Sequence, residues 1–168
     1  MTEPSIVDRP AQRYLGIAAK VHMSKIASVG DTLPGELFGW LGRRGLVAAA
    51  APFFRYYAIS ADGTLDLEWG VPIAVAAPGD ERVRPGELPA GRYASLIHVG
   101  PYGGIRDATA ALHQWIKDRG ERQDVAITPA GDRIAACWVE FYPTDPRLEP
   151  DQKKWVSEIA IKLADGAP

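Results

Sequence analysis

An internal repeat constrains the fold of this chain more than any other feature. "PAQRY" at residues 10–14 returns as "PAGRY" at residues 89–93, 79 residues further along. Each copy is followed by an apolar run of strand length, at residues 15–22 and at residues 94–100. A five-residue echo is weak by itself, so its meaning depends on whether the later segments also match.

The segments that follow do match, because each strand-like run leads into a helical pattern. The expected helices cover residues 30–46, with Pro34 at an early position, and residues 103–121. Their ends align as "LFGWLGRRG" over "LHQWIKDRG", which places Gly45 over Gly120. Both glycines fall where a helix end favours a residue that tolerates positive φ. Two matched segments in the same order, offset by 79 and then 75 residues, indicate a duplication.

Two more strand-like runs complete each half, and they define the expected fold. They cover residues 52–60 and 65–74 in the first half, joined by an Asp62-Gly63 turn, and residues 133–142 and 155–163 in the second. One β-α-β-β unit is too small to bury its own apolar face, so two copies must share a core. We therefore expect a single α+β domain over residues 1–168 with pseudo-twofold symmetry. The repeats span residues 4–77 and 88–164, residues 77–91 connect them, and a ligand groove lies between the halves.

Charge and motif content exclude several classes of function. Nineteen basic and 21 acidic side chains give a net charge of about −2, so no electrostatic feature predicts a nucleic-acid partner. The single cysteine, Cys137, cannot form an internal disulfide and is expected to be a buried thiol. There is no signal-peptide pattern and no apolar stretch of about 20 residues, so we expect a cytoplasmic protein without membrane segments. The three histidines are scattered, and no metal site or cofactor is expected.

A carboxylate between aromatic residues is the most informative candidate for a site. Strand periodicity places Trp138, Glu140 and Tyr142 on one face of their strand. An unpaired buried carboxylate would cost several kcal/mol, which leaves three explanations. Glu140 lies on a solvated face, or it pairs with an arginine such as Arg55, or it awaits a cationic or polarised ligand in an aromatic-lined cleft.

The other candidates are aromatic residues of the neighbouring strands and helices. Trp69, Tyr56 and Phe54 are expected in the wall of the cleft on strand geometry. Trp40 and Trp115 lie on the apolar faces of their helices, which is typical of core packing but leaves ligand contact open for Trp40. Glu158 occupies the position equivalent to Glu68 and is a second candidate for the buried acid.

The duplicated plan, together with the stretches "PAGRYASLIHVGPYGGIRDATAALHQWIKDRG", "EFYPTDP" and "WVSEIAIKL", resembles the GyrI-like small-molecule-binding family. This family also supplies the effector-binding domain of MerR- and AraC-type transcription activators. The resemblance covers about residues 4–164. It implies two SHS2-like modules and an aromatic-lined groove that binds lipophilic, often cationic compounds against a glutamate. By motif, that glutamate is Glu140 and the tyrosine of "GPYGG" is Tyr102.

The resemblance implies one leading function and two alternatives. The leading function is the binding of aromatic, often cationic drugs or toxins. Some stand-alone members are hydrolases that open the cyclopropane of DNA-alkylating natural products. In that case Glu140 would be the general base, and Tyr102 or Tyr142 would stabilise the developing negative charge. A protein-interaction role such as gyrase inhibition is the third. Regulators of the family carry a helix-turn-helix domain ahead of this unit, whereas this chain begins with the first strand, so direct DNA binding is not expected.

Overall fold

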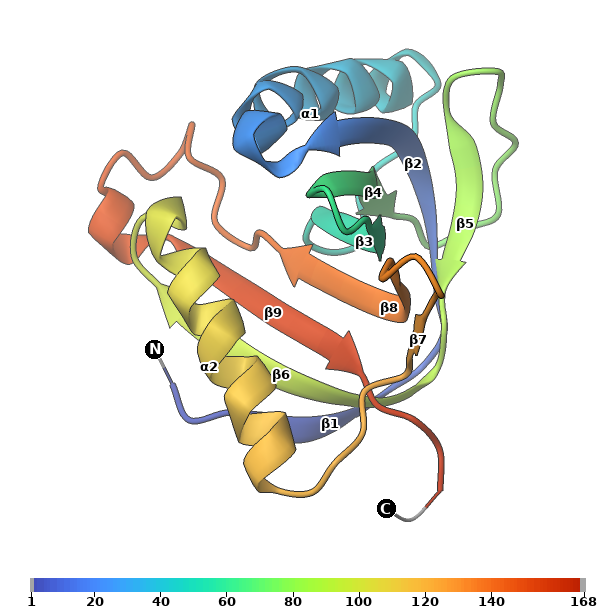
Figure 1. The fold of residues 1–168 in the computed structure, drawn as a ribbon. Helices are drawn as coiled ribbons and strands as arrows, with labels where there is room; N and C mark the ends of the chain where they lie inside the picture. Colours follow the sequence, from blue (N-terminus) through green and yellow to red (C-terminus); the bar gives the residue numbers. More distant parts are fainter. Residues whose placement is uncertain (1, 167–168) are drawn as a thin grey trace.

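The computed structural model describes residues 2–166, which form one curled antiparallel sheet and two helices (Figure 1). The sheet has nine strands in the order β1-β6-β9-β8-β3-β4-β2-β5, and β7 pairs with β8. The strands are β1 (Ser5–Arg9), β2 (Gln12–His22), β3 (Phe53–Ile59), β4 (Thr64–Pro72), β5 (Arg84–Leu88), β6 (Gly91–Val99), β7 (Val125–Ile127), β8 (Arg133–Phe141) and β9 (Val156–Lys162). The expected α+β class is confirmed.

The strand order is symmetric about the boundary between β3 and β8. Outward from this boundary, β3, β4, β2 and β5 on one side correspond to β8, β9, β6 and β1 on the other. The register extends the correspondence to single residues. Tyr14 pairs with Pro72, and its counterpart Tyr93 pairs with Lys162. Trp69 and Ile159 each lie three residues before these partners, so they are counterparts as well. Trp69 pairs with Phe54 and Ile159 pairs with Glu140, which makes Phe54 the counterpart of Glu140.

Phe54 and Glu140 are also direct cross-strand partners. Two residues that are both repeat counterparts and pairing partners can only flank the symmetry axis. The pseudo-twofold axis therefore passes between these two side chains, and their neighbours Tyr56 and Tyr142 are counterparts as well.

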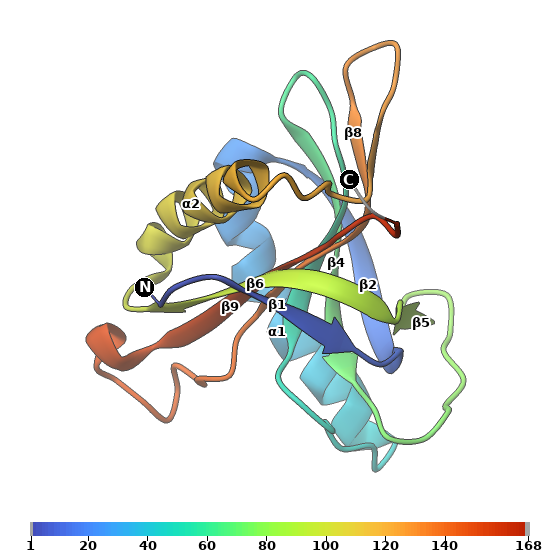
Figure 2. The same cartoon turned by 90° about the horizontal axis from the view of Figure 1, so that it is seen from below.

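Both helices cover the same face of the sheet. Helix α1 (Ile26–Arg43) packs on β2 and β4, and α2 (Ile105–Asp118) packs on β6 and β9 (Figures 1 and 2). Their buried faces carry Leu33, Leu37, Trp40 and Leu41 in α1, and Ile105, Ala108, Leu112 and Ile116 in α2. The two helix cores meet at Trp138 and Tyr142, which contact both. The seam of the duplication thus lies under the space between the helices.

The C-terminal ends of both helices agree with the sequence prediction, whereas the start of α1 does not. Gly45 and Gly120 follow the helices with φ of 67° and 68°, as their position predicts. The start of α1 was wrongly placed, because a 3-10 turn at Met23–Lys25 leads directly into the helix at Ile26. Pro34 therefore lies inside α1 instead of in its first turn, and the carbonyl of Gly30 lacks the usual partner four residues on.

Three short strands were not predicted. The expected connector contains β5, which pairs with β2, while β1 crosses over to pair with β6 (Figure 2). A short strand at the start of the first repeat and another just ahead of the second therefore each join the sheet of the other repeat. Proline and glycine in β5 are typical of loops, but they are tolerated at the edge of a sheet. The third, β7, is a three-residue strand beside β8.

Candidate functional site

Glu140 lies at the pseudo-twofold axis, on the helix-covered face of β8. Its side chain is buried, with the residue 7% exposed. The hydroxyl groups of Tyr56 and Tyr142 donate hydrogen bonds to its Oε2 atom at 3.0 and 2.8 Å. Each half of the molecule therefore contributes one tyrosine to the same carboxylate oxygen.

The second oxygen of Glu140 is in a different situation. Oε1 accepts no hydrogen bond from the described residues, yet it is not sealed from solvent. Burial raises the pKa of the Glu140 carboxyl above its ordinary value, and the two tyrosine hydrogen bonds oppose that rise in part. The site thus presents one carboxylate oxygen without a hydrogen-bond partner, on a group whose charged form is destabilised by burial.

Aromatic rings surround the carboxylate and the tyrosines that hold it. Trp69 stacks on Tyr142 with ring centroids 5.6 Å apart, and Trp138 packs on Tyr56 at 4.9 Å. Phe54 meets the rings of Trp69 and Tyr142 edge-on at 4.9 and 6.0 Å. The sequence-predicted residues Phe54, Tyr56, Trp69, Trp138 and Tyr142 are therefore brought together around Glu140. We call this group with Glu140 the aromatic cluster.

The outer side of the cluster is formed by residues that follow β6 and precede β9. Tyr102, in the 3-10 turn before α2, contacts the ring of Tyr142 edge-on at 5.4 Å. Its other neighbour is Trp155, 4.6 Å away between centroids, which the sequence analysis did not single out. His113 of α2 meets Trp138 edge-on at 5.5 Å and was likewise overlooked. Burial and the nearby Arg133 lower the pKa of His113, so a neutral imidazole borders the cluster. Periodicity could have placed His113 near the core, but no local signal marks Trp155.

Two of the three explanations for Glu140 are wrong. The solvated explanation fails because the residue is buried. The arginine explanation fails because Arg55 points to the opposite face of the sheet, where its guanidinium donates to the Tyr14 hydroxyl and to the carbonyls of Glu87 and Ala136. Alternation along β3 dictates this, since Arg55 stands between Phe54 and Tyr56, which both face the cluster.

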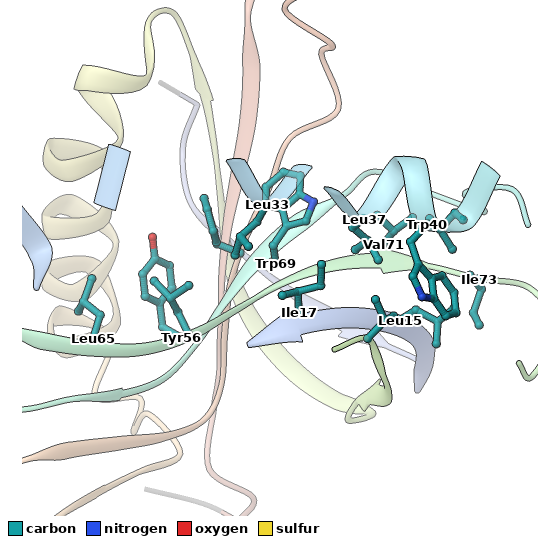
Figure 3. Close-up of a cluster of buried hydrophobic side chains, with 14 residues drawn as sticks. Leu15, Ile17, Leu33, Leu37, Trp40, Tyr56, Leu65, Trp69, Val71 and Ile73 are labelled. Carbon is teal, nitrogen blue, oxygen red and sulfur yellow. The ribbon is translucent and has the colours of Figure 1, made fainter. Parts of the chain in front are cut away.

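Trp40 and Glu158 are placed away from the cluster. Trp40 packs beside Leu15 and Ile73 at one end of the first core, with Trp69 between it and Tyr56 (Figure 3). Its indole N–H donates to Asp80 Oδ2 at 2.7 Å, so Trp40 binds the loop that precedes β5 to helix α1. Glu158 lies on the sheet face opposite Glu140, where Arg9 and Ser95 donate hydrogen bonds to it. The structure thus assigns Glu140, not Glu158, to the aromatic cluster.

A second carboxylate held by tyrosines lies on the face without helices. The hydroxyls of Tyr14 and Tyr57 donate to Glu68 Oε1, and Arg55 reaches the Tyr14 hydroxyl at 3.1 Å. The Glu68 side chain has room for this arrangement because residue 16 is a glycine. A Cβ on Gly16 would lie 2.7 Å from the Glu68 side chain. The network compensates a buried arginine and a buried glutamate on the same face.

The rings of the aromatic cluster are packed against one another along the seam. A hollow of about 350 Å³ lies elsewhere, beside β2 and β5, and is lined by Arg13, Tyr14, Ile73, Ala76, Ala77, Pro85, Gly86 and Glu87. A much smaller one of about 10 Å³ borders Trp138 and Tyr56 where β3 and β8 separate. Neither of these two hollows is lined by Glu140.

Two further observations bear on the function. Within residues 2–166, no three His, Cys, Asp or Glu side chains are grouped so that they could hold a metal ion. Neither α1 nor α2, the helices of this same part of the chain, is long and apolar enough to cross a membrane.

A buried acid inside an aromatic cluster, placed at the axis of a duplicated domain, is typical of a domain that binds small organic molecules. The chain matches the family described as the GyrI-like small molecule binding domain over residues 2–164, and it belongs to that family. No curated protein matches it.

Several solved structures share the fold. The DNA complex of EcmrR has a TM-score of 0.76 and 18% identity; the match covers 98% of this chain and 58% of the EcmrR chain. SAV2435 bound to tetraphenylphosphonium has a TM-score of 0.69 and 13% identity, with 97% and 94% covered. A hydrolase from Listeria innocua has a TM-score of 0.61 and 14% identity, with 96% and 92% covered. At these identities the comparisons establish the fold.

Proposed function

We propose that this domain binds lipophilic aromatic cations in the aromatic cluster, with Glu140 as the counter-charge. The observation that carries the proposal is the state of this carboxylate, which is buried among rings and has one oxygen without a hydrogen-bond partner. A buried carboxylate without a cation is costly, and a ligand cation compensates the part of that cost that the two tyrosine hydrogen bonds leave. The phosphonium complex of SAV2435 supports this choice of ligand class.

The stacking in the cluster suggests where the ligand enters. Tyr142 is only partly buried and lies between Trp69 and Tyr102, with centroid distances of 5.6 and 5.4 Å. An aromatic ring of the ligand that takes its place would stack on the Trp69 indole and bring its cationic centre near Glu140. Stacking and cation–π contacts contribute roughly 0.5–2 kcal/mol each, in addition to the charge attraction.

Titration calorimetry with tetraphenylphosphonium tests the proposal. We expect a dissociation constant in the micromolar range, which corresponds to about −8 kcal/mol. Glu140→Gln should weaken binding about tenfold or more, because loss of a buried charge pair costs at least about 1.4 kcal/mol. Glu158→Gln is the matched control, since it makes the same chemical change on the opposite face. Equal affinities of the wild type and Glu140→Gln would refute the role of Glu140.

A second candidate function is hydrolysis of a strained, electrophilic ligand in the same cluster. It is favoured by the raised pKa of Glu140 together with its free oxygen, since both suit a general base that takes a proton from water. The hydroxyl group of Tyr102 is a candidate donor to a developing oxyanion, whereas that of Tyr142 would first have to leave Glu140 Oε2. Incubation with a cyclopropanoid alkylating agent should then yield, over many turnovers, a product heavier by one water in mass spectrometry. Glu140→Gln should abolish it, and normal turnover by that variant would exclude Glu140 as the base.

A further inference from the structure

Two indole N–H groups in the aromatic cluster have no hydrogen-bond partner. Nε1 of Trp69 and Nε1 of Trp138 are sealed from solvent and unpaired among the described residues. This is not general in the protein, because Trp40 donates to Asp80 and Trp155 donates to the carbonyl of Glu149 at 2.8 Å. A buried donor without an acceptor costs roughly 1–3 kcal/mol, so these two groups call for an explanation.

Both unpaired indoles lie one ring away from the carboxylate. Trp69 stacks on Tyr142, and Trp138 packs on Tyr56, which are the two tyrosines that hold Glu140 Oε2. The unsatisfied donors and the carboxylate oxygen without a partner therefore lie within the same aromatic cluster. A ligand that reaches Glu140 by displacing Tyr142 also uncovers Trp69.

The two indoles differ in one respect. Trp138 borders the hollow of about 10 Å³ beside Cys137, which is close to the space that one water molecule requires. Trp69 lines neither of the two hollows and is 5% exposed. Trp138 thus has a small hollow beside it, whereas Trp69 borders neither hollow, and its N–H gains an acceptor only when a ligand brings one.

We propose that the ligands of this site carry a hydrogen-bond acceptor oxygen, such as a ketone, ester or ether, and that Trp69 Nε1 donates to it. The inference rests on the proposed function and narrows it: the preferred ligands are aromatic cations with an acceptor, and cations made only of hydrocarbon groups bind less well. Because the indole N–H lies in the ring plane, the oxygen must stand on a substituent that passes the edge of the indole. A ring stacked on the indole face cannot supply it.

A pair of phosphonium probes tests this in calorimetry. (4-Acetylphenyl)triphenylphosphonium and (4-isopropylphenyl)triphenylphosphonium have the same charge and nearly the same shape, and only the first carries a carbonyl oxygen. The wild type should bind the acetyl probe about three- to tenfold more tightly, as expected for one hydrogen bond. Trp69→Phe keeps an aromatic ring but removes the donor, so it should bind both probes equally. Trp40→Phe, which removes a paired indole N–H away from the cluster, should keep the preference.

The outcomes separate this inference from the proposed function. If both probes bind the wild type equally, or if Trp69→Phe keeps the preference, the acceptor inference is overturned and cation binding stands. If neither probe binds, both proposals fail. Should Trp69→Phe not fold, the wild type labelled with ¹⁵N at its indoles answers the same question. The Trp69 indole proton, assigned by elimination with the other Trp→Phe variants, should shift downfield with the acetyl probe only, and its failure to move overturns the inference.

Discussion

Tyr56 and Tyr142 occupy equivalent positions in the two repeats, and both donate to the same oxygen of Glu140. The duplication thus supplies a symmetric pair of donors to a position that is itself asymmetric, because the counterpart of Glu140 is Phe54. One acid and one ring at the axis give the site a single charge.

Removal of either tyrosine hydroxyl should change the pH dependence of cation binding. A hydrogen bond to the ionised carboxylate lowers its pKa, so Tyr56→Phe and Tyr142→Phe should each raise the pKa of Glu140 further above its ordinary value. Affinity for tetraphenylphosphonium should then fall several-fold near neutral pH and recover at higher pH. Tyr102→Phe is the control, since Tyr102 donates no hydrogen bond to Glu140. A midpoint that stays in place in both variants would contradict the assignment.

The stability of the unliganded protein should carry the signature of a raised carboxyl pKa. Between the ordinary value of 4.5 and the higher folded value, the folded state holds a proton that the unfolded state has lost. The free energy of unfolding contributed by Glu140 therefore decreases as pH rises through this window. Glu140→Gln removes this component, so the variant should gain stability relative to the wild type as pH increases, as measured by urea denaturation. A constant difference across the window would show that the folded pKa is not raised.

Arg55 should contribute to the stability of the fold, although it lies outside the aromatic cluster. It joins β3 to Tyr14 of β2, to the Glu87 carbonyl of β5 and to the Ala136 carbonyl of β8. Arg55→Met leaves these three acceptors without their donor, and unsatisfied buried groups of this kind should cost about 1–3 kcal/mol in urea denaturation. Arg147→Met, at an exposed ion pair, should change stability by less than about 0.5 kcal/mol. Similar small effects in both variants would argue against a structural role for Arg55.

Trp40→Phe should separate stability from binding. The substitution removes the hydrogen bond to Asp80 and part of the packing against the first core, which should cost about 1–2 kcal/mol in the free energy of unfolding. Affinity for tetraphenylphosphonium should stay within twofold of the wild type, because Trp40 lies away from the cluster. A clear loss of affinity would place Trp40 in the binding site after all.

Gly70 should tolerate no side chain, for a reason of packing. A Cβ at this position would lie 2.4 Å from the ring of Phe53, its cross-strand partner. Gly70→Ala should therefore destabilise the protein by about 1–3 kcal/mol in thermal or urea unfolding. Gly35→Ala is the matched control in α1, where a Cβ meets nothing, and it should stabilise by up to about 1 kcal/mol. Equal effects would mean that the Phe53 ring moves aside easily.

The repeat made most of the fold predictable from the sequence. Long apolar periodic segments became β2, β3, β4, β6, β8, β9 and the two helices, because each must bury one face. The short strands β1, β5 and β7 were missed because they lie at sheet edges or are only three residues long. Their place in the sheet is decided by distant partners, and their own composition carries little signal.

The sequence predicted those parts of the candidate site that depend on which residues of a strand share one face. Alternation placed Trp138, Glu140 and Tyr142 on one face, and the structure agrees. It also could have excluded Arg55 as the partner of Glu140, since Arg55 alternates with Phe54 and Tyr56. The packing of Trp155 and His113 against the cluster depends on how loops and helices meet the sheet, which no local pattern contains.

The crossed pairing of β1 with β6 also orders events during synthesis. Ser5 leaves the ribosome long before its neighbour Ser95 exists, so the first strand to be made has nowhere to dock until the second repeat emerges. Until then β2 lacks β5 as well, and the leading repeat is an incomplete sheet with an open border. A nascent chain halted between the repeats should therefore be sensitive to proteases and prone to pair with other chains, whereas in the finished chain β5 covers β2 and β1 covers β6.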